Sequence, residues 1–228
     1  MIPLFLKSTE FEEPDASAYY LLAANGVFLV KKGGIFSSVT EAPLVGLGRQ
    51  RPSLKLGFPK LPRELLERMY GFFQYAYEQF DSEAVVFLYY SPEQGIFHAD
   101  APPQVVTRYR TYHGWRTAGN VEYGTMSRPH GFLKLGDAHS HGESPAFFSP
   151  TDDRDDGEDG LRIVMGALHR PQPEVRVSFI ASGTRFRLEP HEVLEDFIEP
   201  TRPPDEWTER IECRYEDVRI QRHTHEGE

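Results

Sequence analysis

The chain has 228 residues and a formal net charge of −10, and hydrophobic residues make up 39% of it. These values are typical of a globular protein with one sizeable core, and the acidic excess argues against binding to nucleic acid or to an anionic membrane surface. There is one cysteine, Cys213, so no internal disulfide can form, and no apolar stretch reaches the roughly 18 residues of a membrane span. We therefore expect a soluble, cytoplasmic protein.

The first sixty residues carry strand and turn signals. Residues 19–24 and 27–30 are apolar runs on either side of Asn25-Gly26, a dipeptide that strongly favours a hairpin turn. Residues 35–40 follow a second glycine-containing turn and predict a third strand. We expect a small β-rich N-terminal region over residues 1–60.

A helix followed by a buried strand is predicted next. Pro62 suits the first turn of a helix, and helical spacing of apolar residues predicts a helix over about residues 62–80. The residues that share this spacing are Leu65, Met69, Phe72, Phe73, Ala76 and Phe80. Residues 84–90 are almost continuously apolar, which is typical of a strand buried on both faces.

The remainder of the chain alternates between strand patterns and loops. Strands are predicted at residues 104–109, 132–139, 161–168, 175–181 and 184–188, and a short helix at 190–199. Residues 110–131 lack periodicity and predict a long loop, and residues 201–228 predict a charged, partly disordered tail. The main domain is therefore expected at residues 61–200.

Two histidines at the end of one predicted strand form a candidate metal site. His139 and His141 are two residues apart, so both side chains lie on the same face of the strand. Two imidazoles on one face are a natural chelate for zinc. Taken alone, such a pair is more often an ordinary surface pair than a pair of ligands.

A third ligand is predicted eleven residues further on. In Ser149-Pro150-Thr151-Asp152, serine is a favoured N-cap, proline a favoured first helical residue, and an acid three residues after the cap completes a capping box. Asp152 is thus expected in the first helical turn, where a short loop can bring it over the histidines. Two histidines and one carboxylate leave a fourth position open, which is the catalytic arrangement of zinc.

The spacing His139-x-His141-x₇-Ser149-x₂-Asp152 resembles the signature of the JAMM (JAB/MPN+) zinc metallopeptidases. The resemblance implies a mixed β-sheet flanked by helices, an α/β (α+β) fold related to the cytidine-deaminase-like fold. It also implies that Glu83, just before the buried strand, is the general acid/base and that Ser149 steadies the oxyanion. Val86 stands where the family commonly has glycine, so Glu93, Glu122 and Glu143 are alternatives to Glu83.

Over nearly the whole chain, the sequence is also similar to the protein A family of bacterial PRTRC cassettes and to JAB peptidases of related antiphage operons. Residues 21–28, the helix before Glu83 and the segment 139–153 carry this likeness. It implies partners in the form of a ubiquitin-like modifier, its conjugates, and activating or conjugating enzymes of the same operon. Residues 110–131 and 153–160 are the segments expected to grip the modifier.

The function expected from this resemblance is zinc-dependent cleavage after the C-terminus of a ubiquitin-like modifier, either from a conjugate or from a precursor. One alternative is a peptidase that processes a sulfur-carrier precursor. Another, from a different class, is a non-catalytic scaffold of the MPN type. Phe147 and Phe148 are equally compatible with substrate contact and with core packing.

Overall fold

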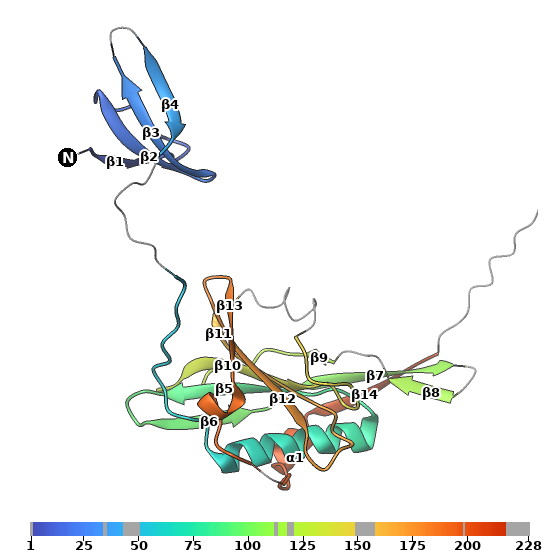
Figure 1. Ribbon diagram of the computed structural model, residues 1–228. Coiled ribbons are helices and arrows are strands. Elements are labelled where there is room, and N and C mark those ends of the chain that lie inside the picture. Colours follow the sequence, from blue (N-terminus) through green and yellow to red (C-terminus); the bar gives the residue numbers. More distant parts are fainter. Residues whose placement is uncertain are drawn as a thin grey trace, which may run out of the picture. The chain divides into compact units, whose positions relative to one another are not determined.

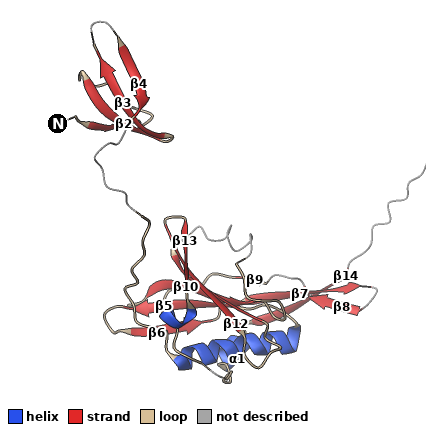
Figure 2. Ribbon diagram, in the orientation of Figure 1, coloured by secondary structure: helices blue, strands red, loops and turns tan. Residues whose placement is uncertain are grey.

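The computed structural model describes residues 2–33, 36–42, 51–111, 114–117, 121–148, 158–197 and 199–217. The chain divides into two compact units, Met1–Ser53 and Leu54–Glu228, which are described separately below. Figure 1 shows the helices and strands coloured by position in the sequence, and Figure 2 shows them coloured by type. Most of the described elements are strands, and the longest helix belongs to the second unit.

The first unit is a four-stranded sheet in the order β1-β2-β3-β4. Its strands are β1 (Leu4–Leu6), β2 (Ala18–Ala23), β3 (Gly26–Lys32) and β4 (Ser37–Glu41). The predicted hairpin at Asn25-Gly26 is confirmed by the antiparallel pairing of β2 with β3. Tyr19, Leu21 and Val30 form its small core.

The second unit contains a mixed six-stranded sheet in the order β13-β12-β11-β10-β5-β6. Its strands are β5 (Val85–Ser91), β6 (Ile96–Asp100), β10 (Leu133–Ser140), β11 (Gly160–Gly166), β12 (Glu174–Ala181) and β13 (Thr184–Leu188). β10 pairs parallel with β11 and antiparallel with β5. This is the mixed sheet that the sequence predicted, although β6 was not foreseen.

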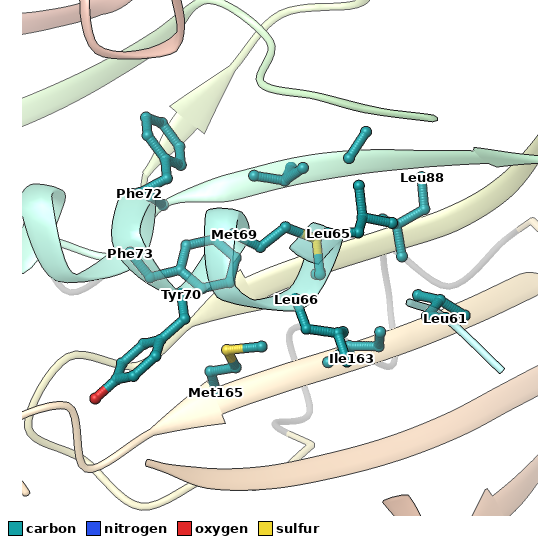
Figure 3. Close-up of a cluster of buried hydrophobic side chains, with 14 of the residues drawn as sticks. Leu61, Leu65, Leu66, Met69, Tyr70, Phe72, Phe73, Leu88, Ile163 and Met165 are labelled. Atoms are coloured by element: carbon teal, nitrogen blue, oxygen red, sulfur yellow. The ribbon is translucent and has the colours of Figure 1, made fainter. Parts of the chain in front are cut away.

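Helix α1 (Arg63–Phe80) covers one face of this sheet, as Figure 1 shows. It begins after Pro62 and ends at Asp81, whose backbone is left-handed with φ 54°. The predicted helix at residues 62–80 is thus confirmed. Figure 3 shows its apolar side chains against Leu88 of β5 and Ile163 and Met165 of β11, within the main core.

The two faces of β5 belong to different clusters. Val86 and Leu88 pack in the core under α1, whereas Val85, Phe87 and Tyr89 form a second buried cluster on the opposite face. Alternation along the strand sends successive side chains to opposite faces, so an apolar run is required where both faces are covered. The prediction of a strand buried on both faces is confirmed.

The prediction of a long loop at residues 110–131 is wrong in part. A second sheet in the order β14-β7-β8, with β9 also pairing with β7, passes through this region. Its strands are β7 (Gln104–Thr111), β8 (Gly114–Thr117), β9 (Glu122–Tyr123) and β14 (Ile211–Asp217). β8 and β9 are too short to give a periodic signal, and their pairing with β7 holds them in place.

The segment after residue 200 contains two elements that the sequence analysis did not assign. Helix α4 (Asp205–Thr208) carries Trp207, which is only 3% exposed and packs edge-on against Phe72 at 5.5 Å between ring centroids. β14 then pairs parallel with β7 along its full length. Residues 201–217 are therefore part of the folded unit, whereas the rest of the predicted tail, residues 218–228, lies outside the described residues.

The helix predicted at residues 190–199 is shorter than expected. Helix α3 covers Pro190–Val193 only. The chain then becomes extended at Leu194, which forms an isolated parallel bridge with Leu61. Backbone hydrogen bonds from Leu61 N to Val193 O and from Glu195 N to Leu61 O, at 2.8 and 3.0 Å, replace further helical turns.

Candidate metal centre

The candidate metal centre lies at the end of β10, a central strand of the six-stranded sheet. His139 is paired with Val85 of β5 on one side and with Val164 of β11 on the other. Because β5 runs antiparallel to β10 and β11 runs parallel to it, the start of β5 and the end of β11 lie at the same end of the sheet as the histidines. Three segments far apart in the sequence therefore meet here.

The structure brings the two predicted histidines together. The Nε2 atoms of His139 and His141 are 3.2 Å apart, and their ring centroids are 5.1 Å apart. His139 is half-buried, and His141 is 8% exposed. The two-residue spacing therefore does place both rings on one side of the chain, with the same nitrogen of each ring facing the other.

A backbone carbonyl fixes the orientation of the second ring. His141 Nδ1 lies 3.2 Å from Pro145 O. A carbonyl oxygen can only accept a hydrogen bond, so Nδ1 is the donor and, in the neutral ring, Nε2 keeps its lone pair. Such a hydrogen bond on the distal nitrogen is the usual way in which a protein aims a histidine at a metal.

The loop after His141 is tied to the end of β11. His141 N donates to Met165 O at 2.8 Å, Ala167 N to Ser144 O at 2.7 Å, and Leu168 N to Gly142 O at 2.9 Å. Gly142 has φ 54°, a left-handed conformation that favours glycine and turns the chain directly after His141. The position of the Pro145 carbonyl thus depends on backbone contacts between the loop and β11.

Gly166 makes this close contact possible. A side chain at this position would overlap Ala146 N, and it would also meet the backbone of Pro145 and Ser144. The backbone of Gly166 is not in the left-handed region, so the requirement for glycine here is one of space alone. The sequence analysis missed this residue, because a glycine at the end of a strand has no distinctive pattern.

The histidine pair fits zinc. Zinc–nitrogen bonds of about 2.05 Å in a tetrahedral site place two nitrogen ligands about 3.3 Å apart, close to the 3.2 Å between the two Nε2 atoms. Ser149 and Asp152, the predicted oxyanion and third-ligand residues, lie outside the described residues. Within the described ranges no three His, Cys, Asp or Glu side chains are grouped as a metal site, so the full ligand set stays a prediction.

Glu83 lies next to this pair in the sheet register. β10 pairs His139 with Val85, and Ala84 and Ser140 are joined by hydrogen bonds of 3.0 Å from Ser140 N to Ala84 O and from Ala84 N to Ser140 Oγ. One further step of the antiparallel register places Glu83 opposite His141. Residues opposite each other on neighbouring strands share a face of the sheet. Glu83 is half-buried, and its position in the strand register is next to the candidate metal centre.

The three alternative glutamates are placed differently. Glu143 is in the loop after His141, where it accepts a hydrogen bond of 3.0 Å from Tyr77 Oη. Glu93 lies in the turn between β5 and β6, at the far end of β5 from the histidines. Glu122 belongs to β9 and pairs with Arg214 at 3.5 Å. The register therefore favours Glu83 over Glu93 and Glu122, while Glu143 lies in the loop near the pair and bonds with Tyr77.

Two aromatic residues border the histidines. The Phe147 ring, 48% exposed, packs edge-on against His141 at 4.6 Å between centroids. Tyr77 of α1 touches the Gly142 turn and donates to Glu143. Burial first, and then the hydrogen bond to Glu143, raise the pKa of the Tyr77 hydroxyl above its ordinary value, so Tyr77 remains a neutral donor at neutral pH. Core packing of Phe147, one of the two predicted possibilities, is not observed.

None of the helices in the described ranges combines the length and the hydrophobicity needed to cross a membrane.

No curated protein is significantly similar in sequence. Among solved structures, the chain is similar to the solution structure of protein DSY2949 from Desulfitobacterium hafniense, with 17% identity, a TM-score of 0.37, and coverage of 64% of this chain and 96% of that chain. The family model for prokaryotic homologs of the JAB domain matches residues 72–188, which contain α1 from Phe72 onward, β5 to β13 and both histidines. The chain therefore belongs to the prokaryotic JAB-domain family.

Proposed function

We propose that this protein is a zinc-dependent peptidase that cleaves the amide or isopeptide bond after the C-terminus of a bacterial ubiquitin-like modifier. The observation that carries the proposal is the 3.2 Å separation of the His139 and His141 Nε2 atoms, together with the register that puts Glu83 opposite His141. An aligned pair of histidines, with a glutamate next to it in the sheet register, supports the catalytic alternative over a non-catalytic scaffold.

In the proposed reaction, each residue of the site has one role. His139, His141 and Asp152 hold the zinc, which when bound supplies a Lewis acid and lowers the pKa of water towards neutrality. The Glu83 carboxylate takes a proton from the attacking water and passes it to the leaving amine. The Ser149 hydroxyl donates a hydrogen bond to the carbonyl oxygen as negative charge develops there.

The extended C-terminal segment of the modifier is proposed to add to an edge of the six-stranded sheet. β13 pairs only with β12 among the described strands, and it is the sheet edge on the β11 side of the histidines. An edge strand offers unpaired N–H and C=O groups, and pairing with them recognises an extended peptide without regard to its sequence.

The proposal is tested first by metal content. The full chain, purified at neutral pH and loaded with zinc, should hold close to one zinc per chain, and His139→Ala, His141→Ala and Asp152→Asn should each lose it. His169→Ala, a substitution of an exposed histidine, is the matched control and should keep the metal. A wild-type chain that takes up no zinc would overturn the proposal.

The second test is cleavage. The substrate is the ubiquitin-like protein encoded beside this gene, fused through its C-terminus to a reporter. Glu83→Gln should retain zinc and lose cleavage, and Glu143→Gln should retain both. If the zinc-loaded wild type cleaves neither this fusion nor a precursor with residues beyond the modifier's terminus, the scaffold alternative replaces the peptidase.

A further inference from the structure

A cavity of about 470 Å³ lies between the loop after His141 and the hairpin of β12 and β13. Its walls are formed by Phe147 and Phe148 on one side and by residues of β12, β13 and the start of α3 on the other. The volume is within the range of roughly 300–1,000 Å³ typical of ligand pockets. Because the Phe147 ring also contacts the His141 ring, the cavity begins one side chain away from the candidate metal centre.

Arginines dominate the polar side of this cavity. Arg176 of β12 and Arg187 of β13 line it, and among the described residues of its wall Glu189 is the one acid. Arg185 lies close by, with its guanidinium group 4.4 Å above the Phe148 ring and a hydrogen bond of 2.7 Å to Ser178 Oγ. In a chain with a net charge of −10, this concentration of positive charge is local and marks a site for an anionic group.

The sheet register connects these arginines to the histidines. His139 pairs with Val164, and Val164 pairs with Arg176, so His139 and Arg176 lie in one row across three neighbouring strands and on the same face. Strands are spaced about 4.8 Å apart, which places the two Cα atoms about 10 Å from each other. Three residues of an extended peptide span about this distance.

The two arginines that line the cavity are available for a ligand. Arg176 and Arg187 are exposed, and in the described parts of the chain neither forms an ion pair; Arg176 donates only to its neighbour's carbonyl, Val175 O, at 3.3 Å. A guanidinium group binds a carboxylate in a bidentate geometry, with two parallel hydrogen bonds, which an ammonium group cannot form. The aromatic walls leave room for the apolar part of a peptide.

We propose that this cavity is a subsite that binds a carboxylate of the peptide substrate, two or three residues from the bond that is cleaved. The inference rests on the proposed peptidase function and narrows its substrate to peptides with an acidic side chain or a free terminal carboxylate on the β12–β13 side of the metal centre. A terminal carboxylate in this subsite corresponds to trimming of a precursor, and a side-chain carboxylate corresponds to recognition within a longer chain.

Binding of three fluorescent glycine-rich peptides of equal length to the zinc-free full chain tests the subsite. The first has a free C-terminal carboxylate and no acidic side chain, the second has a C-terminal amide and one glutamate, and the third has a C-terminal amide with glutamine in place of glutamate. Working without zinc prevents the carboxylates from binding the metal directly. We expect the first or second peptide to bind at least about fivefold more tightly than the third, as measured by fluorescence anisotropy.

The double variant Arg176→Gln/Arg187→Gln should remove this preference. Arg116→Gln, which removes an exposed arginine from β8 in the other sheet, is the matched control and should leave it unchanged. Equal affinities for the three peptides, a preference that survives the double variant, or no binding at all would each overturn the subsite. Thermal unfolding of each variant checks that the fold is retained.

The two proposals fail separately. If binding depends on the carboxylate but the zinc-loaded chain cleaves nothing, the subsite proposal stands and the peptidase proposal is wrong. If the wild type and the double variant both cleave acidic and neutral substrates at the same rate, the peptidase proposal stands and the subsite proposal is wrong.

Discussion

The side-chain amide of Gln104 forms two hydrogen bonds with the backbone of Val85: Val85 N donates to Gln104 Oε1 at 2.8 Å, and Gln104 Nε2 donates to Val85 O at 2.9 Å. The ladder between β5 and β6 ends at Phe87, so the glutamine takes the place of the missing strand partner at Val85. Gln104 is itself held by a bond from its N to Arg210 O at 2.9 Å. The second sheet thereby fixes the start of β5, two residues after Glu83.

Gln104→Leu is expected to destabilise the protein. Gln104 is 1% exposed, and its removal leaves the N–H and C=O of Val85 buried without partners, which costs on the order of 3 kcal/mol in the free energy of unfolding. Gln74→Leu is the matched control: within the described residues its Oε1 is a buried atom without a partner, and its Nε2 donates only to the exposed Glu78. Urea unfolding measures both, and equal losses in the two variants would contradict the role given to Gln104.

Gly166→Ala is expected to weaken zinc binding more than it weakens the fold. The added methyl group pushes the Ser144–Ala146 backbone away from β11, and with it the Pro145 carbonyl that orients His141. Loss of such an orienting contact typically lowers metal affinity about 10- to 100-fold. Gly57→Ala, where a methyl group would meet nothing, is the control. Competition with a zinc-sensitive dye measures the affinities, and an unchanged value for Gly166→Ala would refute the role of the carbonyl.

Trp207→Ala is expected to cost about 3–5 kcal/mol of stability, as for other large buried aromatic residues. The other tryptophan, Trp115, is 42% exposed, and Trp115→Ala should cost under about 1 kcal/mol. Denaturant unfolding followed by circular dichroism compares the two. A small effect at Trp207 would mean that the segment after residue 200 is dispensable for the fold.

Stability is expected to fall as the pH rises above about 10, the ordinary pKa of tyrosine. Burial raises the pKa of Tyr77, so the folded state keeps this proton at pH values where the unfolded state has lost it, and each further rise in pH favours unfolding. Below the unfolded pKa the contribution is fully present. Tyr77→Phe should reduce the slope of stability against pH in this range, as measured by urea unfolding at a series of pH values.

The sequence predicted what depends on local periodicity. Helical spacing from Leu65 to Phe80 identified α1, and the two-residue spacing of His139 and His141 predicted rings on one side of the chain. Both patterns report which way a side chain points relative to its neighbours along the chain.

Features that depend on long-range pairing were missed. β14 pairs with β7 across more than a hundred residues, and nothing in the charged segment 211–217 shows it in advance. Gln104 was assigned correctly to a strand, but its amide bonds with Val85 depend on where two sheets meet. The need for glycine at position 166 likewise follows from the approach of a separate loop.

The contacts that orient His141 have a consequence for how the protein would acquire the proposed zinc ion. Its amide, its Nδ1 atom and the loop that follows are all bonded to the chain itself. Zinc therefore does not need to organise this part of the site, and little conformational entropy is lost when it binds. For the proposed zinc site this predicts that folding precedes metal binding: a chelator should strip the ion and leave a cooperatively folded chain that reloads without passing through the unfolded state.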